Sequence, residues 1–357
     1  MKVLMHSCIL VLLVILVGCS NYGSVQLPPD RLSYNSSLQY SDSQQILLNM
    51  VRLRYTDIPY FLTVNNVVSQ FSYSRTGTLN IANNTSSPPA LSGSANGAIS
   101  LSESPTLTYT PLQGEDYAKR LLTPIDLSVL YRLIRSGWGV DKVIRLLLQR
   151  LGPYDNATMA SRQTSKRMPT YKEFQRLGLM IRALDYSNHV VTDPVESNGN
   201  FALRLTFTHF KTIPLKYKIR LKKIHITAKT PFLWIDSVIV KQPRHYYAQV
   251  RSVLELLNYV SKGVDVPKEH FQQGVARITY DEHKKPFDWH VVTHGQMRVH
   301  SSRNKPTDDY LSIRYHGYWF YIKDQDFHSK ETLNIISVIM GIYQGDVKSI
   351  LPVFTVS

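Results

Sequence analysis

Cysteine is nearly absent from this sequence, and its absence excludes whole classes of chemistry. The 357 residues contain only Cys8 and Cys19, both close to the N-terminus. The rest of the chain therefore has no thiol for a disulfide bond, a cysteine zinc site or a nucleophile. We expect the folded part to be stabilised by packing alone, even in a compartment that would permit disulfides.

Acidic residues are also scarce relative to basic ones. The chain has 26 Asp and Glu against 41 Lys and Arg, which gives a formal net charge of +15. This excess favours anionic partners such as anionic lipid, glycan or an acidic protein surface. Nucleic acid would respond to the same field, but we expect none in the compartment that the N-terminus indicates.

The N-terminal segment has the order of a secretory signal. Lys2 supplies a short positive region, residues 9–17 form an unbroken apolar run, and the small Gly18 follows. This run is too short and wrongly flanked for a membrane-spanning helix. We therefore expect export of the chain.

The end of that segment, Leu16-Val17-Gly18-Cys19, resembles the lipobox of bacterial lipoproteins. The resemblance implies that residues 1–18 are removed and that the Cys19 thiol carries a diacylglyceryl group, which attaches the chain to a membrane. Ser20 follows the anchor, and by the same resemblance this favours the outer membrane, with the body facing the periplasm.

The remaining chain predicts an α+β fold in one integrated body. Residues 19–40 are polar and contain Pro28-Pro29, so we expect a flexible tether. We expect a mainly helical region at residues 41–187, with a mobile Ser, Asn and Gly-rich loop at residues 76–104. After a boundary at residues 188–200, residues 201–357 predict an antiparallel, β-rich half with packed helices.

Local signals place the helices and one hairpin more closely. Two pairs of residues have capping-box spacing and predict helix starts: Ser41 with Gln44, and Thr170 with Glu173. Gly137-Trp138-Gly139 separates two runs of helical periodicity, the second reaching Leu151, and predicts an αα-hairpin. Alternation around His316-Gly317 predicts a β-hairpin.

Four segments resemble uncharacterised envelope proteins of Gram-negative bacteria. They are NMVRLRY (49–55), PTLTYTPLQGE (105–115), LLTP (121–124) and IRYHGYWFYI (313–322). Their spread covers most of the chain after the signal. The resemblance therefore implies one integrated unit, and it implies no catalytic residue because that group has no assigned activity.

One charge pattern stands out. Basic and apolar residues alternate from Leu215 to Lys222, which as a strand would give one cationic and one apolar face. The basic positions are Lys216, Lys218, Arg220 and Lys222. Two interpretations remain open: a surface that binds an anionic partner, or a solvated strand whose lysines block edge pairing.

Metal and catalytic candidates are poor. His290 and His294 would share a face of a strand, as metal ligands do. Chance spacing among 12 histidines is the better interpretation, with Asp288 the only carboxylate nearby, so we expect no metal and no cofactor. Catalytic motifs such as Gly-x-Ser-x-Gly, His-Glu-x-x-His and the Walker loop are absent.

These observations favour a lipid-anchored outer-membrane protein with a non-enzymatic binding or scaffolding role in an envelope assembly. The alternatives are a periplasm-facing hydrolase that acts on envelope glycan or lipid, and a carrier of a hydrophobic ligand. A cleft with converging polar groups would support the hydrolase, and an internal apolar cavity the carrier.

The lipobox gives the first testable prediction. Cys19→Ala should leave a precursor that the lipoprotein pathway does not process, because the acceptor thiol is gone. Acyl chains contribute about 0.8 kcal/mol per buried CH₂ to membrane attachment. Metabolic labelling with palmitate and fractionation of the envelope would measure this. A Cys19→Ala chain that is processed and membrane-bound like its parent would contradict the prediction.

Overall fold

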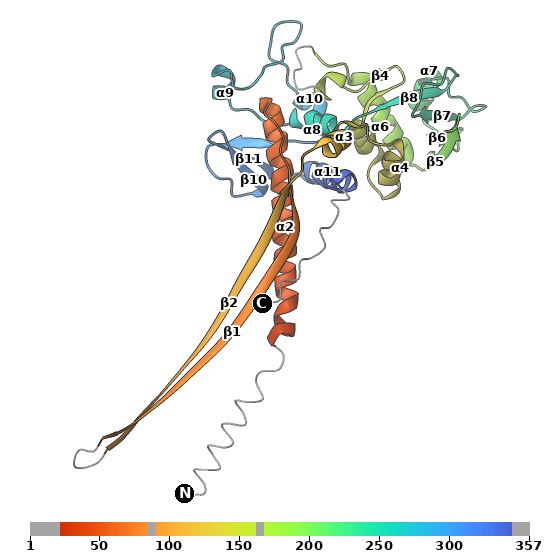
Figure 1. Cartoon of the computed structure of the whole chain (residues 1–357). Coiled ribbons are helices and arrows are strands. Elements are labelled where there is room, and N and C mark those ends of the chain that lie inside the picture. The colour runs from red at the N-terminus through yellow and green to blue at the C-terminus, as the bar shows by residue number, and fades with distance from the viewer. Residues whose placement is uncertain (1–21, 85–89, 162–167, 345–357) are drawn as a thin grey trace. The chain divides into compact units, whose positions relative to one another are not determined.

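The computed structural model describes residues 22–84, 90–161 and 168–344 (Figure 1). Within these residues the chain forms two compact units. Residues 60–118 form one, which we call the hairpin unit, and the chain on either side of it forms the other, which we call the body. The fold class is α+β, as the sequence predicts.

The first helix is longer than predicted. Helix α2 spans Tyr22–Tyr55, so the predicted tether at residues 19–40 is helical from Tyr22 and Ser41 is not an N-cap. Most side chains of residues 31–42 are exposed. The segment therefore has no apolar stripe from which a helical period could be detected. Further along, one face of the helix is apolar and buried, as Leu47, Met50 and Leu53 are fully enclosed.

A mixed sheet of six strands forms one layer of the body. Its strand order is β4-β3-β8-β7-β6-β5, with β7 and β8 parallel and the other neighbours antiparallel. The strands are β3 (Leu148–Leu151), β4 (Tyr154–Asp155), β5 (Val190–Ser197), β6 (Asn200–Phe207), β7 (Phe232–Asp236) and β8 (His245–Val250). Because strands from both sides of residues 188–200 share this sheet, the predicted boundary there is wrong.

A group of helices packs against this sheet, and the chain forms further helices outside it. The helices after α2 are α3 (Glu115–Leu122), α4 (Leu127–Arg135), α5 (Val140–Leu147), α6 (Lys172–Tyr186), α7 (Leu215–Lys223), α8 (Val253–Ser261), α9 (Lys268–Gln272), α10 (His290–Thr293) and α11 (Phe327–Gln344), with a 3₁₀ turn, η1, at Thr158–Ser161. Of these, α4, α5 and α6 pack against the sheet. The predicted helix pair is present as α4 and α5. Its second helix ends at Leu147 instead of Leu151, because the chain there joins the sheet as β3.

The capping box predicted at Thr170 and Glu173 is also absent. Tyr171, not Thr170, is the N-cap of α6, and no side chain caps that end. Glu173 instead pairs with Arg176. The capping box in this part of the body belongs to α8, where Ser252 and Glu255 bond each other's backbone N–H groups.

A three-stranded antiparallel sheet completes the body. Its order is β10 (Asp309–Tyr315), β11 (Tyr318–Lys323) and β9 (His300–Ser302). The turn lies at His316 and Gly317, both at positive φ, as predicted. Helix α2 packs on β10, where the Gln44 side chain donates a 2.9 Å hydrogen bond to the Ser312 carbonyl. None of the described helices combines the length and apolar character needed to cross a membrane.

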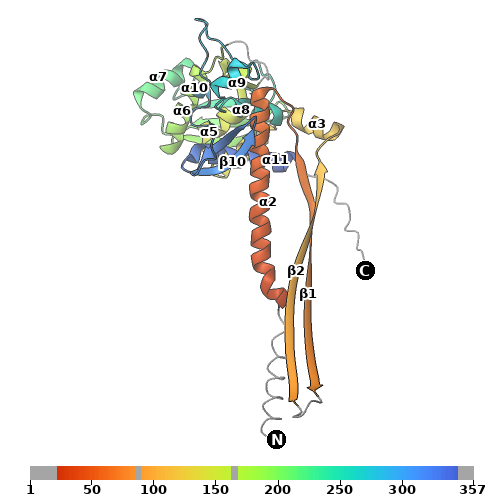
Figure 2. The same ribbon diagram turned by 90° about the vertical axis from the view of Figure 1, so that its left-hand side faces the viewer.

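The hairpin unit consists mainly of two very long strands. β1 (Leu62–Asn84) and β2 (Ala90–Pro111) pair antiparallel along their whole length (Figure 2). The predicted mobile loop at residues 76–104 is therefore wrong over the described residues. Ser, Asn and Gly are typical of loops, but here cross-strand pairing determines the structure in place of local propensity.

Arg251 is a fully buried cation in the body. Its guanidinium donates to the backbone carbonyls of Arg145, Leu146, Leu148 and Asn156 at 2.7–2.9 Å and to the Ser161 hydroxyl at 2.8 Å. It also lies 4.1 Å from the centre of the Tyr259 ring. Burial lowers its pKa to about 10, so it stays charged at neutral pH and satisfies carbonyls that the end of α5 leaves unpaired.

Replacing Arg251 should be strongly destabilising. Arg251→Leu removes the guanidinium donor from all four carbonyls, and among the described residues only those of Arg145 and Leu148 keep a donor, the Asn156 side-chain amide. We expect a loss of about 3 kcal/mol or more in the free energy of unfolding. Arg251→Lys should lose most of this as well, because an ammonium cannot reproduce the planar fork. The matched control is Arg150→Leu on β3, where the guanidinium is half-exposed beside Asp155 and should cost no more than about 1 kcal/mol. Denaturant unfolding measures all three, and equal losses for Arg150→Leu and Arg251→Leu would contradict the assignment.

Lys262 is a second buried cation, only 5% exposed. Its ammonium lies 5.8 Å from the centre of the Trp289 ring. Burial, with a smaller effect of Arg54, lowers the pKa of Lys262 to about 7. The unfolded chain, with an ordinary lysine pKa, therefore binds more protons than the fold between about pH 7 and 10, and stability should rise with pH in that window.

The Lys262→Met variant tests this. Removing the charge should stabilise the fold by several kcal/mol at pH 6, where the whole cost of burying an ammonium is present, and progressively less as pH rises toward 10. The control is Lys268→Met at the start of α9, where the side chain is exposed. Unfolding free energies at pH 6 and pH 9 measure the difference. A Lys262→Met effect that does not depend on pH would contradict the prediction.

Candidate anion-binding cleft

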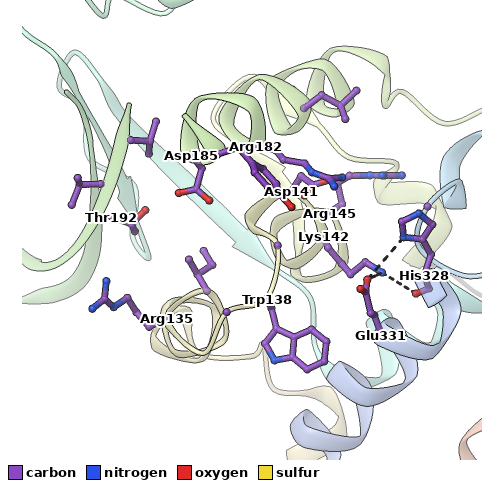
Figure 3. A pocket seen from close by; sticks show the side chains of 18 of the residues that line it. Arg135, Trp138, Asp141, Lys142, Arg145, Arg182, Asp185, Thr192, His328 and Glu331 are labelled. Atoms are coloured by element: carbon purple, nitrogen blue, oxygen red, sulfur yellow. Dashed lines mark hydrogen bonds and ion pairs between the residues drawn. The ribbon is translucent and has the colours of Figure 1, made fainter. Parts of the chain in front are cut away.

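The body contains an open cleft of about 700 Å³ (Figure 3). It lies beside the break between α4 and α5 and is bordered by α6, β5 and the first turn of α11. A volume of this order suits a small ligand. We refer to it as the cleft.

The break between α4 and α5 opens the cleft. Gly137 has φ of 93°, which glycine adopts without strain. Gly139 is the N-cap of α5. It has no side-chain acceptor, so no side chain caps the start of that helix. Trp138, between the two glycines, is half-buried and lines the cleft. Because Gly137 and Gly139 have no side chains, the break between α4 and α5 leaves space for the cleft.

Two cations in the cleft have acidic partners. The Lys142 ammonium lies 2.7 Å from a Glu331 carboxylate oxygen and donates to the His328 carbonyl at 2.8 Å. Burial lowers the pKa of Lys142, and Glu331 opposes that shift. Arg182 lies 3.3 Å from Asp141, which raises the pKa of Arg182. These pairs join α5 to α11 and α6.

Two further cations have no carboxylate partner among the described residues. Arg145 is 5% exposed, and its guanidinium donates only to the backbone carbonyls of Val292 (3.1 Å) and His294 (2.8 Å), while its Nε has no acceptor there. Arg135 is exposed at the end of α4. On the other side, burial raises the pKa of Asp185, the remaining acid of the cleft. Positive charge is therefore in excess.

The predicted cationic strand is wrong. Leu215–Lys223 forms α7, which follows Pro214. Residues two apart in a helix point in nearly opposite directions, so Lys216, Lys218, Arg220 and Lys222 do not form a single stripe. Their contacts are local: Lys218 donates to the Lys211 carbonyl, Arg220 to the Arg176 carbonyl, and Lys216 lies over the Tyr217 ring.

The two histidines predicted as metal candidates are not on a strand. His290 begins α10 and His294 is its C-cap. His290 instead joins His300 on Asp265, with nitrogen-to-carboxylate distances of 2.5 and 3.4 Å. Burial tends to raise the pKa of Asp265, but its bonds to both histidines hold it well below the usual range. No group of three or more His, Cys, Asp or Glu in the described part of the chain is arranged to hold a metal.

The predicted lipidation site lies outside the described residues, and the acidic and aromatic residues around the β10–β11 hairpin have structural roles. Cys19 lies outside it. Asp326 bonds the Ser329 backbone and hydroxyl at the start of α11, and Asp324 pairs with Lys330. Of the aromatic residues of the β10–β11 hairpin, Phe320 is buried against the Tyr55 ring.

Sequence reasoning missed the cleft itself. Its residues come from four separate stretches between Ile134 and Glu331, and no spacing in the sequence joins them. The one available signal was the Gly-Trp-Gly break. No known protein family, curated protein or solved structure matches this chain.

Proposed function

We propose that this chain is a lipid-anchored protein of the Gram-negative outer membrane that binds an anionic segment of an envelope glycan in the cleft, without catalysis. The observation that carries the proposal is Arg145, a nearly buried cation beside the cleft whose guanidinium has only neutral carbonyls as hydrogen-bond acceptors among the described residues. Coulomb attraction is strong where water is scarce, so a carboxylate or phosphate in the cleft would be stabilised.

Three further features support this ligand chemistry. Arg135 and Arg182 offer guanidinium groups, which bind carboxylate and phosphate through paired hydrogen bonds. Trp138 and Tyr186 add aromatic surface for the apolar face of a sugar. The net charge of +15 would attract anionic material over a longer range. The mixture of charged and aromatic lining suits a glycan better than the hydrophobic cargo of a carrier.

The lipid anchor and the compartment are part of the same proposal. They depend on the lipobox resemblance of Leu16-Val17-Gly18-Cys19 and on Ser20 after it. The anchor would hold the cleft close to envelope glycans and so raise their effective concentration. Membership of a larger envelope assembly is compatible with this role.

Arg182→Gln tests the cleft as the binding site. The variant removes one guanidinium and leaves Asp141 without its partner, so affinity for an anionic sugar should fall about tenfold or more, equivalent to about 1.4 kcal/mol. Suitable probes are N-acetylglucosaminyl-N-acetylmuramic acid, glucosamine 1-phosphate and, as the neutral counterpart, diacetylchitobiose. Calorimetric titration would measure the affinities.

The matched control is Arg204→Gln. Arg204 faces Asp193 at 3.5 Å on β5 and β6 with a similarly exposed side chain, but it does not line the cleft. The Arg204→Gln variant should bind the anionic sugars with the same affinity as the parent protein. Equal binding of neutral and anionic sugars, or equal losses in the two variants, would contradict the proposal.

A glycan hydrolase is the second candidate. The observation in its favour is Asp185, an exposed residue that lines the cleft. Partial desolvation raises the pKa of its carboxyl group, the direction found for carboxylic acids that donate a proton. Cleavage of the muramic acid disaccharide during the titration would favour this alternative.

A further inference from the structure

The two strands of the hairpin unit are almost free of charge. Arg75 is the only charged residue of β1 and Glu103 the only one of β2. The whole chain, in contrast, is 19% Asp, Glu, Lys and Arg. A long ribbon with both outer edges free in water normally carries charges, often lysine, that prevent edge pairing. This absence therefore needs an explanation.

The register divides the residues of the hairpin between two faces. From Asn66↔Thr108 outward, odd-numbered residues pair with odd and even with even, and residues directly opposite each other share a face. The apolar residues at odd positions are Val67, Phe71, Tyr73, Leu79 and Ile81 on β1 and Leu91, Ala95, Ile99, Leu101 and Leu107 on β2. The even positions are mostly Ser, Thr, Asn and Gln.

We propose that the odd-numbered face of this hairpin contacts the hydrocarbon interior of a lipid bilayer. Strands with few charges in which apolar residues alternate with small polar ones are typical of segments that meet lipid on one side and water on the other. Both charged residues of the hairpin, Arg75 and Glu103, fall at odd positions as well. This proposal does not depend on the cleft or on its ligand.

Length supports a bilayer as the partner. The odd positions from Val67 to Ile81 are apolar except for Ser69, Arg75 and Gly77. This stretch extends for roughly 50 Å at the usual rise of about 3.3 Å per residue. A strand tilted by about 45° would then cover roughly 35 Å along the bilayer normal, enough for a hydrocarbon core about 30 Å thick. A second protein would need an equally long apolar groove to cover the same face.

The backbone requires more than one copy of the chain. β1 and β2 pair only with each other within the described residues, so no other described strand supplies hydrogen-bond partners to the N–H and C=O groups along the two outer edges of the hairpin. In hydrocarbon each such group costs several kcal/mol. Hairpins of neighbouring copies therefore pair edge to edge in the bilayer, and their even-numbered faces contact water.

Single cysteines test the two faces directly. The scarcity of native thiols makes the labelling specific, since Cys8 can be replaced and Cys19 is the residue expected to carry lipid. The variants are Leu79→Cys and Ile99→Cys for the odd face, with their neighbours Thr78→Cys and Ser100→Cys as matched controls. Each full-length chain is labelled with an environment-sensitive fluorophore and reconstituted into vesicles of phosphatidylethanolamine and phosphatidylglycerol.

The odd-position labels should shift to shorter emission wavelength and be quenched several-fold more by brominated acyl chains than the even-position labels. The even-position labels should be quenched by iodide in water. Equal quenching at the two parities would overturn the proposal. The same blue shift without vesicles would overturn it as well, because protein would then cover the odd face. Simple co-sedimentation is not informative, since the N-terminal lipid alone would attach the chain.

A pair of acidic substitutions provides a second readout. Ile81→Asp should abolish the release of an entrapped dye from these vesicles, while Asn80→Asp should release it like the parent. Circular dichroism of both variants checks that the body remains folded. Dye release that is unchanged in Ile81→Asp, or lost equally in both variants, would contradict contact of this face with lipid.

Discussion

The body depends on the hydrogen bonds of one buried guanidinium. Arg251 lies at the junction of β8 and α8 and bonds carbonyls at the end of α5, on β3 and beyond β4. The chain changes there from helix to strand, which leaves several carbonyls without a backbone donor. A planar group with five donors satisfies them in a space that water does not reach. The point at which α5 stops and the sheet begins is therefore set by a residue about a hundred positions away.

This constraint also positions the cleft. All eight residues of α5 are buried, although the helix contains Asp141, Lys142 and Arg145. Its C-terminal end is held by Arg251, and its N-terminal turn is held by the pairs of Asp141 with Arg182 and of Lys142 with Glu331. A buried helix with this many charges is stable only when each charge has a partner or a hydrogen-bond acceptor. The body thus uses its ion pairs to fix one wall of the cleft.

The sequence predicted those features that depend on local periodicity. The α+β class, the α4–α5 pair and the turn at His316 follow from residues close together in the chain. The errors share a different cause. Basic and apolar residues alternate in α7 with the period of a strand, yet Leu, Lys and Arg are also good helix formers and only tertiary context decides. The strands β1 and β2 are determined by their pairing with each other, which composition does not reveal.

The cleft could not be predicted for a related reason. The role of each charged side chain in the cleft depends on the groups that face it in the folded structure, and Arg145 is the clearest case. Of the buried cations, Arg251 has five oxygen acceptors and Lys142 has a carboxylate. Lys262 can lose its proton, since burial lowers its pKa to about 7. Arg145 has no carboxylate partner in the part of the chain that the structure describes, where its guanidinium donates to two carbonyls only. A buried charge left in that condition beside an open cleft is stabilised most by an anion that enters from outside.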